Sequence, residues 1–486
     1  MSGPRRARAV MVLGTTSGAG KSWLTTALCR HYARQGLQVA PFKAQNMSNN
    51  ARVVVGGEIG SAQFFQALAA RAEPEVRMNP LLLKPERDTH SQVVLLGQVD
   101  EELTRMDWRG RSEKVWPTVA RALDELMAVN DVVVIEGAGS PAEINLMASD
   151  IVNLRVARHV QARCLLVTDI DRGGAFAHLY GTWALLPEAD RALIHGFVLN
   201  KFRGDARLLA PGPQQLQDLT GVPTVATLPM WWQHGLPEED GVFDDRHTGS
   251  GEIHTRIAVV AYPRISNLDE FQPLKNVPGV SLRWARSPAE LQDVDWIILP
   301  GSKHTSGDLA WLRAQRLDRA IAGHAAQGRA VLGICGGLQM LGEALVDTHG
   351  IDGNAPGLGL LPLVTAFEPA KTVRRTQARF GAVAGPWAAL SQLAVSGYEI
   401  HHGQTAQHPA MAARGDVARE LIPGLAWQNE AGQVLGVYLH GLFEDPAVLQ
   451  ALFGARVPTL ESVFDGLADF INDHVEPGVL DALIRD

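Results

Sequence analysis

The segment GTTSGAGKS, residues 14–22, constrains the fold of this 486-residue chain more than any other stretch. It follows the short apolar run ARAVMVL at residues 7–13 and precedes a helix-like pattern at residues 21–35. A glycine-rich loop between a strand and a helix aims its backbone N–H groups, and the helix N-terminus, at one point. The pattern therefore predicts a cradle for phosphate groups. It departs from the ideal spacing in one place, because Thr15 stands where a glycine is usual and Gly14 precedes it.

The loop supplies most of the predicted nucleotide-binding residues. We expect Lys21 to reach the terminal phosphates and the Ser22 hydroxyl to bind Mg²⁺, so ATP and Mg²⁺ are the predicted cofactors. The predicted loop residues are Thr16, Ser17, Gly18, Ala19, Gly20, Lys21 and Ser22.

Three further candidates stand at the ends of predicted strands. Glu136 is the last residue of the apolar run VVVIE, Lys43 comes directly after VAPF, and Asn200 comes directly after GFVL. The carboxyl ends of parallel strands border the ligand crevice of such sheets. Glu136 is a candidate metal ligand, Lys43 a candidate partner for a phosphoryl group or a substrate carboxylate, and Asn200 a candidate reader of a purine. A solvated carboxylate, a surface lysine and a turn asparagine remain the alternatives.

Apolar runs alternate with amphipathic segments twice along the chain. Strands are predicted at 7–13, 131–136, 163–169 and 196–200, and again at 256–262, 280–285, 295–300 and 329–335. Such alternation is typical of parallel sheets with helices on both faces. The predicted fold class is α/β, with two doubly wound, mainly parallel-sheet domains and a helical C-terminal tail. The predicted bounds are 1–240 for the first domain, 241–254 for a linker, 255–445 for the second domain and 446–486 for the tail.

Composition limits the partners of the chain. Its net charge is −8 and its sequence pI is about 6.1, which argues against broad binding to nucleic acid or to an anionic membrane. No apolar run of about eighteen residues is present, and the first apolar run is interpreted as a strand rather than a signal peptide. Three sparse cysteines are typical of a reduced, cytoplasmic protein. The sequence does not predict the oligomeric state.

One cysteine stands in an unusual setting, GICGGLQMLG at residues 333–342. The G-x-C-x-G form is typical of a nucleophile elbow, a sharp strand-to-helix turn that needs small neighbours. The helix behind Cys335 would favour its thiolate, and the N–H of Gly336 would face a developing oxyanion. Gly301 in LPGSKHT is the candidate second oxyanion donor. His440, at the end of QVLGVYLH, is the candidate base, with His401 and His402 as competitors.

Taken together and in order, these motifs resemble the cobyric acid synthase family, glutamine-hydrolysing amide synthases of cobalamin biosynthesis. The resemblance runs over nearly the whole chain and rests on GTTSGAGKS, APFKAQNMSNN, MNPLLLKP, EGAGSPAEINL, DIDRGGAFA, NLDEFQPL, LPGSKHTSGDL, GICGGLQMLG, GYEIHHG and GVYLHGLF. It implies a P-loop domain similar to dethiobiotin synthetase, followed by a class I glutamine amidotransferase domain.

The resemblance also implies a reaction. The b, d, e and g carboxylates of adenosylcobyrinic acid a,c-diamide would be amidated with ATP and glutamine. Carried over by position, Cys335 would be the glutaminase nucleophile and His440 its base. Lys21 and Ser22 would meet phosphate and magnesium, Glu136 would hold the metal, and Lys43 would face the acceptor phosphate. Glutamine and the corrinoid are thus the expected partners.

One position departs from the wider glutaminase pattern. Typical members carry a carboxylate two residues after the histidine, where this chain has Leu442. This branch of the amidotransferases is similar in lacking that residue. Glu444, Glu399 or a backbone carbonyl are the candidates to orient His440.

Three rival interpretations stay open at this point. The a,c-diamide synthase of the same pathway shares both domain types, although NMSNN, MNPLLLKP and DIDRGG favour the later enzyme. A partitioning-type ATPase would carry a second lysine early in the loop, where Thr15, Thr16 and Ser17 stand. A degenerate amidotransferase that acts only as a binding scaffold is the third.

Overall fold

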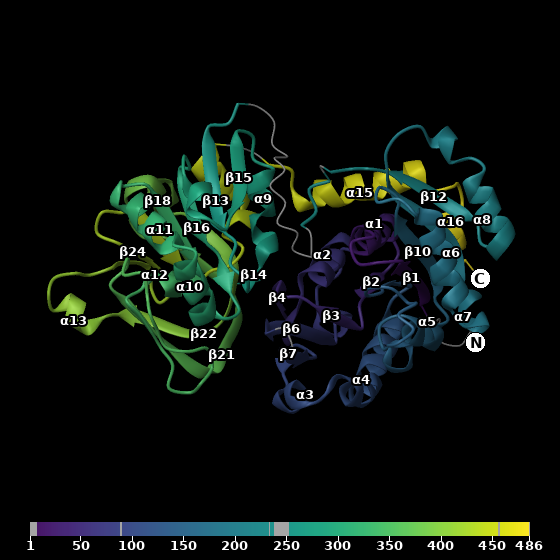
Figure 1. The fold of residues 1–486 in the computed structure, drawn as a ribbon, viewed down its shortest axis with the longest axis horizontal. Coiled ribbons are helices and arrows are strands. Elements are labelled where there is room, and N and C mark those ends of the chain that lie inside the picture. The colour runs from purple at the N-terminus through teal and green to yellow at the C-terminus, as the bar shows by residue number, and fades with distance from the viewer. Residues whose placement is uncertain (1–6, 88–89, 233, 238–251, 455–456, 486) are drawn as a thin grey trace. The chain divides into compact units, whose positions relative to one another are not determined.

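The computed structural model describes residues 7–87, 90–232, 234–237, 252–454 and 457–485. The chain divides into two compact units. Unit 1 comprises Met1–Ser48, Val54–Asp240 and Leu460–Asp486, and unit 2 comprises Asn49–Val53 and Gly241–Thr459. Most of the predicted linker at 241–254 lies outside the described residues. Both units are α/β, as the sequence predicts (Figure 1).

Unit 1 is built on a six-stranded parallel sheet with the order β12-β11-β10-β1-β9-β2. Along β1, Val10 and Val12 join one hydrophobic cluster, whereas Met11 and Leu13 join another. Side chains of a strand alternate between faces, so both faces of this sheet are buried. The strands are β1 (Arg8–Gly14), β2 (Val39–Phe42), β9 (Val132–Glu136), β10 (Arg163–Asp169), β11 (Ile194–Phe202) and β12 (Thr224–Pro229).

Helices cover the two faces and make the sheet doubly wound. One cluster includes residues of α1 (Lys21–Arg34), α2 (Ser61–Ala69) and α15 (Leu460–His474). The other includes residues of α4 (Trp108–Val129), α5 (Leu154–Val160), α6 (Ala175–Leu185) and α8 (Gly212–Thr220). The smaller elements are β3 (Gln45–Met47), β5 (Gly57–Gly60), β6 (Leu81–Arg87), β7 (His90–Leu95), β8 (Gln98–Val99), α3 (Glu101–Arg105), α7 (Glu188–Arg191) and α16 (Val479–Ala482).

The last helices return to unit 1. Figure 1 shows α15, in yellow, beside α1, in purple. The Arg30 side chain of α1 is 1% exposed and forms ion pairs with Glu461 and Asp465 of α15. Trp23 of α1 packs edge-on against Phe470. The predicted tail is therefore divided, since α14 (Pro446–Phe453) belongs to unit 2 whereas Leu460–Asp486 completes unit 1.

Unit 2 contains a seven-stranded sheet with the order β15-β13-β16-β18-β25-β24-β23. Its first five strands are parallel, and β24 and β23 continue it in antiparallel fashion. The strands are β13 (Thr255–Val260), β15 (Val280–Ala285), β16 (Trp296–Leu299), β18 (Ala330–Ile334), β23 (Arg419–Ile422), β24 (Ala426–Gln428) and β25 (Val434–Val437).

A long antiparallel hairpin, β21 (Leu363–Arg379) and β22 (Ala394–Gln407), adds a second sheet to unit 2. The remaining elements of unit 2 are α9 (Gln272–Lys275), α10 (Thr305–Ala314), α11 (Leu317–Ala326), α12 (Gly336–Leu341), α13 (Pro409–Ala412), β14 (Ile265–Ser266), β17 (Gly301–Ser302), β19 (Ala344–Val346) and β20 (Ala355–Pro356). Strand β4 (Ala51–Val54) begins in the short segment Asn49–Val53, which also belongs to unit 2.

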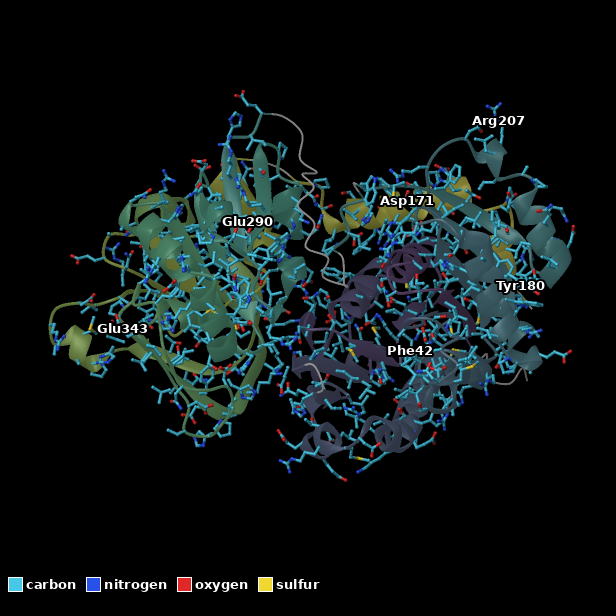
Figure 2. The ribbon with its side chains drawn as sticks, viewed as in Figure 1. Phe42, Asp171, Tyr180, Arg207, Glu290 and Glu343 are labelled. Carbon is cyan, nitrogen blue, oxygen red and sulfur yellow. The ribbon has the colours of Figure 1, made fainter. Side chains whose placement is uncertain are left out.

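The interior and the surface of unit 1 differ as expected for a folded α/β domain. Figure 2 shows Phe42 inside unit 1 and Arg207 projecting from its surface. Phe42 is fully buried, and Arg207 forms an exposed ion pair with Asp205. Among the helices of the described ranges, none combines the length and the apolarity that a membrane span requires.

The Arg30 ion pairs yield a test of the α1–α15 contact. We expect Asp465→Asn to lower the free energy of unfolding by about 1–2 kcal/mol, because it removes a charged acceptor from a buried guanidinium. Asp469→Asn is the matched control, because its partner Arg34 is 38% exposed. We expect this variant to lower the free energy of unfolding by less than about 0.5 kcal/mol. Urea unfolding of both variants measures the difference. Equal losses would contradict the account.

Candidate active sites

Neighbouring strands assemble the first site at one edge of the unit 1 sheet. Strands β1 and β2 both pair with β9, and Val12 lies opposite Glu136 in the register. The glycine-rich loop follows β1, and Lys43 follows β2 directly. The parallel register therefore brings together the loop, Glu136 and Lys43, which are far apart in the sequence.

The glycine-rich loop is held by side chains from other strands. Lys21 is 7% exposed, and its Nζ donates to the carbonyls of Thr16 (3.0 Å) and Gly139 (3.2 Å). Asn200 Nδ2 donates to the Ala19 carbonyl at 2.9 Å. Gly20 has φ 103°, and a Cβ there would lie 2.0 Å from Asn200 Nδ2, so only glycine fits. Asn200 thus contacts the loop backbone, and its predicted role toward a purine stays a prediction.

Glu136 is the centre of a buried polar cluster. Its Oε1 accepts hydrogen bonds from Ser22 Oγ at 2.8 Å and from Lys43 Nζ at 2.9 Å, and its Oε2 accepts from Gln66 Nε2 at 2.5 Å. Burial raises the pKa of this carboxyl, but the Lys43 charge and the three hydrogen bonds outweigh burial and hold the pKa below its usual value. Glu136 is therefore a carboxylate at neutral pH, ready to accept a cation.

The donor set fits a magnesium ion. A serine hydroxyl and a carboxylate are hard oxygen ligands, and Mg²⁺ in nucleotide sites takes few protein ligands besides phosphate oxygens and water. Ser22 and Glu136 are in direct contact, as a shared cation would require. The described residues contain no cluster of three or more His, Cys, Asp or Glu side chains suited to a metal, so a closed site of protein ligands alone is not found there.

In unit 2, Cys335 occupies a strained turn between β18 and α12. Its φ is 50° and its ψ is −105°, and its backbone N donates to the Val437 carbonyl at 2.7 Å. A Cβ on Gly337 would lie 1.9 Å from the Leu299 carbonyl oxygen, so a larger residue would displace the turn. This geometry is that of a nucleophile elbow, in which the surrounding structure holds the strained residue in place.

His440 completes the site from the neighbouring strand. It follows β25, which pairs with β18, and the Cys335 charge is among the causes that raise the pKa of its ring. The Cys335 Sγ lies 3.7 Å from the Ile400 carbonyl oxygen. On the other side, His440 Nδ1 lies 3.0 Å from Glu270 Oε1, and Glu270 Oε2 accepts from the Gly441 N–H at 3.0 Å. Glu270 lies in η4 (Leu268–Phe271), a 3₁₀ turn after β14.

The charges around His440 keep it protonated. Burial by itself lowers the pKa of the imidazole, but the negative charges of Glu270 and Cys335, together with the hydrogen bond to Glu270, raise it to about 10. The group is protonated at pH values below that. Cys335, His440 and Glu270 therefore have the arrangement of a thiol nucleophile, an imidazole acid and base, and an orienting carboxylate.

The candidates for orienting His440 that the sequence suggested are wrong. Glu444 pairs with Arg52 at 2.7 Å, and Glu399 pairs with Arg374 at 2.7 Å. No backbone carbonyl replaces them, because Glu270 takes the Nδ1 position. The competitor His401 is bound to Glu399 and to the Gly403 carbonyl.

The second competitor, His402, is also engaged away from the thiol, since its Nδ1 lies 3.1 Å from the Glu368 carbonyl oxygen. Of the three histidines, His440 is the one whose pKa is raised by interaction with Cys335.

The two predicted oxyanion donors lie beside the reacting groups. A Cβ on Gly301 would lie 2.8 Å from Cε1 of His440, and a Cβ on Gly336 would lie 2.7 Å from the Ser302 backbone N. Asp308 holds this loop by accepting from Ser302 Oγ at 2.6 Å, and burial raises the pKa of Asp308 to about 7. Glycine is required at both positions, because a side chain there would clash with these neighbours.

Sequence reasoning missed Glu270 and Gln66. Glu270 lies in NLDEFQPL, a motif that supported the resemblance but received no role. Its signal was an acidic pair directly before an apolar residue, in a segment that follows the first strand of the domain. Gln66 lies inside a helix, where neither spacing nor composition marks it.

Comparison with known proteins finds a family match for each of the two parts of the chain. Residues 10–236 match the CobQ/CobB/MinD/ParA nucleotide binding domain, and residues 256–448 match the CobB/CobQ-like glutamine amidotransferase domain. Fold, sites and matches define an amidotransferase enzyme joined to a P-loop nucleotide-binding domain.

Three curated relatives, each named cobyric acid synthase, match nearly the whole chain. The proteins from Polaromonas sp. (strain JS666 / ATCC BAA-500) and Polaromonas naphthalenivorans (strain CJ2) are 76% and 77% identical, over 98% of this chain and 98% and 99% of theirs. The protein from Variovorax paradoxus (strain S110) is 79% identical over 98% of this chain and 99% of its own. The chain belongs to the cobyric acid synthase family.

The raised pKa of His440 predicts a pH profile. A protonated imidazole donates to the leaving nitrogen, so we expect glutaminase kcat/KM to fall only as the pH approaches about 10. Glu270→Gln removes the larger of the two charges that raise this pKa, so the fall should begin at lower pH. The measurement is glutamate release against pH. Glu399→Gln is the control, because Glu399 pairs with Arg374 and His401. This variant should keep the wild-type fall in kcat/KM at high pH. If the fall in Glu270→Gln also stays at the wild-type pH, the assignment of Glu270 is contradicted.

Proposed function

We propose that this protein amidates the b, d, e and g carboxylates of adenosylcobyrinic acid a,c-diamide, using ATP and glutamine, to give cobyric acid. The single observation that carries the proposal is the presence, on one chain, of a thiol–imidazole–carboxylate set and a P-loop whose Ser22 contacts a buried carboxylate. The names of the curated relatives support the choice of acceptor.

Unit 1 activates the acceptor in this proposal. A carboxylate does not react usefully with ammonia, so transfer of the γ-phosphoryl group of ATP first makes an acyl phosphate. Such a transfer depends on positioning and charge neutralisation. In this proposal Lys21 neutralises the negative charge of the terminal phosphates of ATP, and Lys43 faces the phosphoryl group during its transfer. Ser22 and Glu136 would hold Mg²⁺, which supplies further neutralisation of the phosphate charge.

The nucleotide base has a candidate location in the same unit. A cavity of about 510 Å³ is lined by Phe202, the last residue of β11, two residues after Asn200. Apolar faces there suit the stacking of a purine ring. The apolar and aromatic lining residues include Phe202, Pro229, Met230 and Trp232. The loop residues Thr16–Ser22 then face the phosphates.

Unit 2 supplies the nitrogen. The Cys335 thiolate attacks the side-chain amide carbon of glutamine, and the N–H groups at Gly336 and Gly301 receive the developing oxyanion. His440 gives its proton to the departing nitrogen, so ammonia leaves and a thioester remains. His440 then takes a proton from water, the hydroxide attacks the thioester, and glutamate is released. Glu270 holds the imidazole in the orientation that both steps require.

Replacing glutamine by ammonium salts as the nitrogen source distinguishes the role of the glutaminase site from that of the ATP site. We expect Cys335→Ser to lower glutamine-dependent amidation by about 1000-fold or more and to spare amidation driven by ammonium salts. Lys21→Ala should abolish both, because ammonia has no activated acceptor without phosphoryl transfer. Product formation by each variant with each nitrogen source is the measurement. An unchanged glutamine-dependent rate in Cys335→Ser would contradict the thiol assignment.

Mass spectrometry of the products identifies the acceptor. Incubation with the a,c-diamide, ATP and glutamine should give a product with four further amide groups, and incubation with the corresponding hexacarboxylate should not give amidation at a and c. Amidation of the hexacarboxylate at a and c would instead assign the a,c-diamide synthase reaction.

A further inference from the structure

A short segment of the N-terminal half belongs to unit 2. Asn49–Val53 clusters with unit 2, although Ser48 before it and Val54 after it cluster with unit 1. The segment overlaps the end of the motif NMSNN, to which the proposed function gives no role.

The segment is docked on the turn that carries Glu270. Asn50 Oδ1 accepts a hydrogen bond from the Leu268 backbone N at 2.9 Å, at the start of η4. The Ala51 backbone N donates to Asn267 Oδ1, also at 2.9 Å. Asn267 has φ 53°, so the chain enters η4 through a left-handed residue that these contacts hold. The segment therefore fixes the start of η4.

Arg52 extends this contact to the surroundings of His440. Its side chain is 2% exposed and forms ion pairs with Asp269, next to Glu270, and with Glu444. The Arg52 guanidinium carbon stands 5.0 Å from the centre of the Tyr398 ring. The Tyr398 ring in turn stacks on the His440 imidazole, with ring centres 5.4 Å apart and planes 20° apart. Arg52 therefore contacts Asp269, which adjoins Glu270, and Tyr398, which stacks on His440.

We propose that Arg52 is a positioning residue for the glutaminase, which sets the Glu270–His440 geometry through Asp269 and Tyr398. The inference rests on the thiol chemistry of the proposed function but not on the identity of the acceptor. A planar guanidinium can serve two carboxylates and an aromatic face at once, which a lysine ammonium cannot.

Charge balance gives the physical reason. Asp269 and Glu270 are buried, and the partly exposed Glu444 adds a third carboxyl group beside them. Like charges repel in such a region, and an unpaired buried charge is costly. Arg52 neutralises Asp269 and Glu444, so Glu270 remains available for His440. Without Arg52, the Asp269 side chain would have to move or take up a proton, and the adjacent Glu270 would move with it.

The test compares charge and shape at residue 52 in the full chain. We expect Arg52→Gln to lower kcat for glutamate release by about 10- to 100-fold, since small misplacements of catalytic groups cost rates of this size. The KM for glutamine and ammonium-driven amidation should stay near wild type. Arg52→Lys should recover part of the loss. Arg374→Gln removes a guanidinium from Glu399 instead and should leave all these values unchanged.

A double-mutant cycle tests the route through Asp269. If Arg52 acts through this carboxylate, Arg52→Gln with Asp269→Asn should lose no more kcat than the worse of the two single variants. The double variant also removes both members of the buried pair, so it keeps the test usable if Arg52→Gln alone folds poorly.

Four outcomes would overturn the proposal: a wild-type kcat in Arg52→Gln, a change in KM alone, an equal loss of ammonium-driven amidation, or additive losses in the double variant. Glutamate release is measured without the corrinoid. Failure of the proposed acceptor would therefore appear as absent amidation by the wild type and would leave the Arg52 result readable.

Discussion

The hydrogen bond between Glu270 and His440 is the interaction on which the second site depends. Both side chains are almost completely buried, at 0% and 1% exposure. A buried carboxylate is costly unless it is paired and hydrogen-bonded. Two hydrogen bonds offset this cost for Glu270, one between Oε1 and the His440 imidazole and one from the Gly441 N–H to Oε2. The same contact fixes the ring that faces Cys335, so the stability of the carboxylate and the orientation of the base have one cause.

Unit 1 also contains a buried carboxylate, and other side chains stabilise it. Glu136 is also buried, and Lys43, Ser22 and Gln66 satisfy its two oxygens. In both units the groups meet because parallel strands end at the same edge of a sheet. The residues are distant in the sequence, yet the register of β1, β9 and β2, or of β16, β18 and β25, makes them neighbours. Each sheet therefore positions chemistry that no local segment could hold.

The strands, the elbow and the phosphate loop could be predicted because their signals are local. Apolar runs mark buried strands, and the glycines around Cys335 mark a strained turn. The partner of His440 could not be predicted, because Glu270 reaches it through tertiary packing and lies outside the position typical of glutaminases. The docking of Asn49–Val53 in unit 2, and the return of α15 to unit 1, also depend on contacts between segments hundreds of residues apart. Periodicity carries no information about such contacts.

The central claim is that buried negative charge keeps His440 protonated beside the thiol. Nitrogen NMR of the full chain with ¹⁵N-labelled histidine, with the His440 signal identified by its loss in His440→Gln, measures this protonation directly. The account predicts an imidazole that stays doubly protonated through neutral pH and titrates at about 10. A His440 signal that is already neutral at pH 7.5 would contradict it.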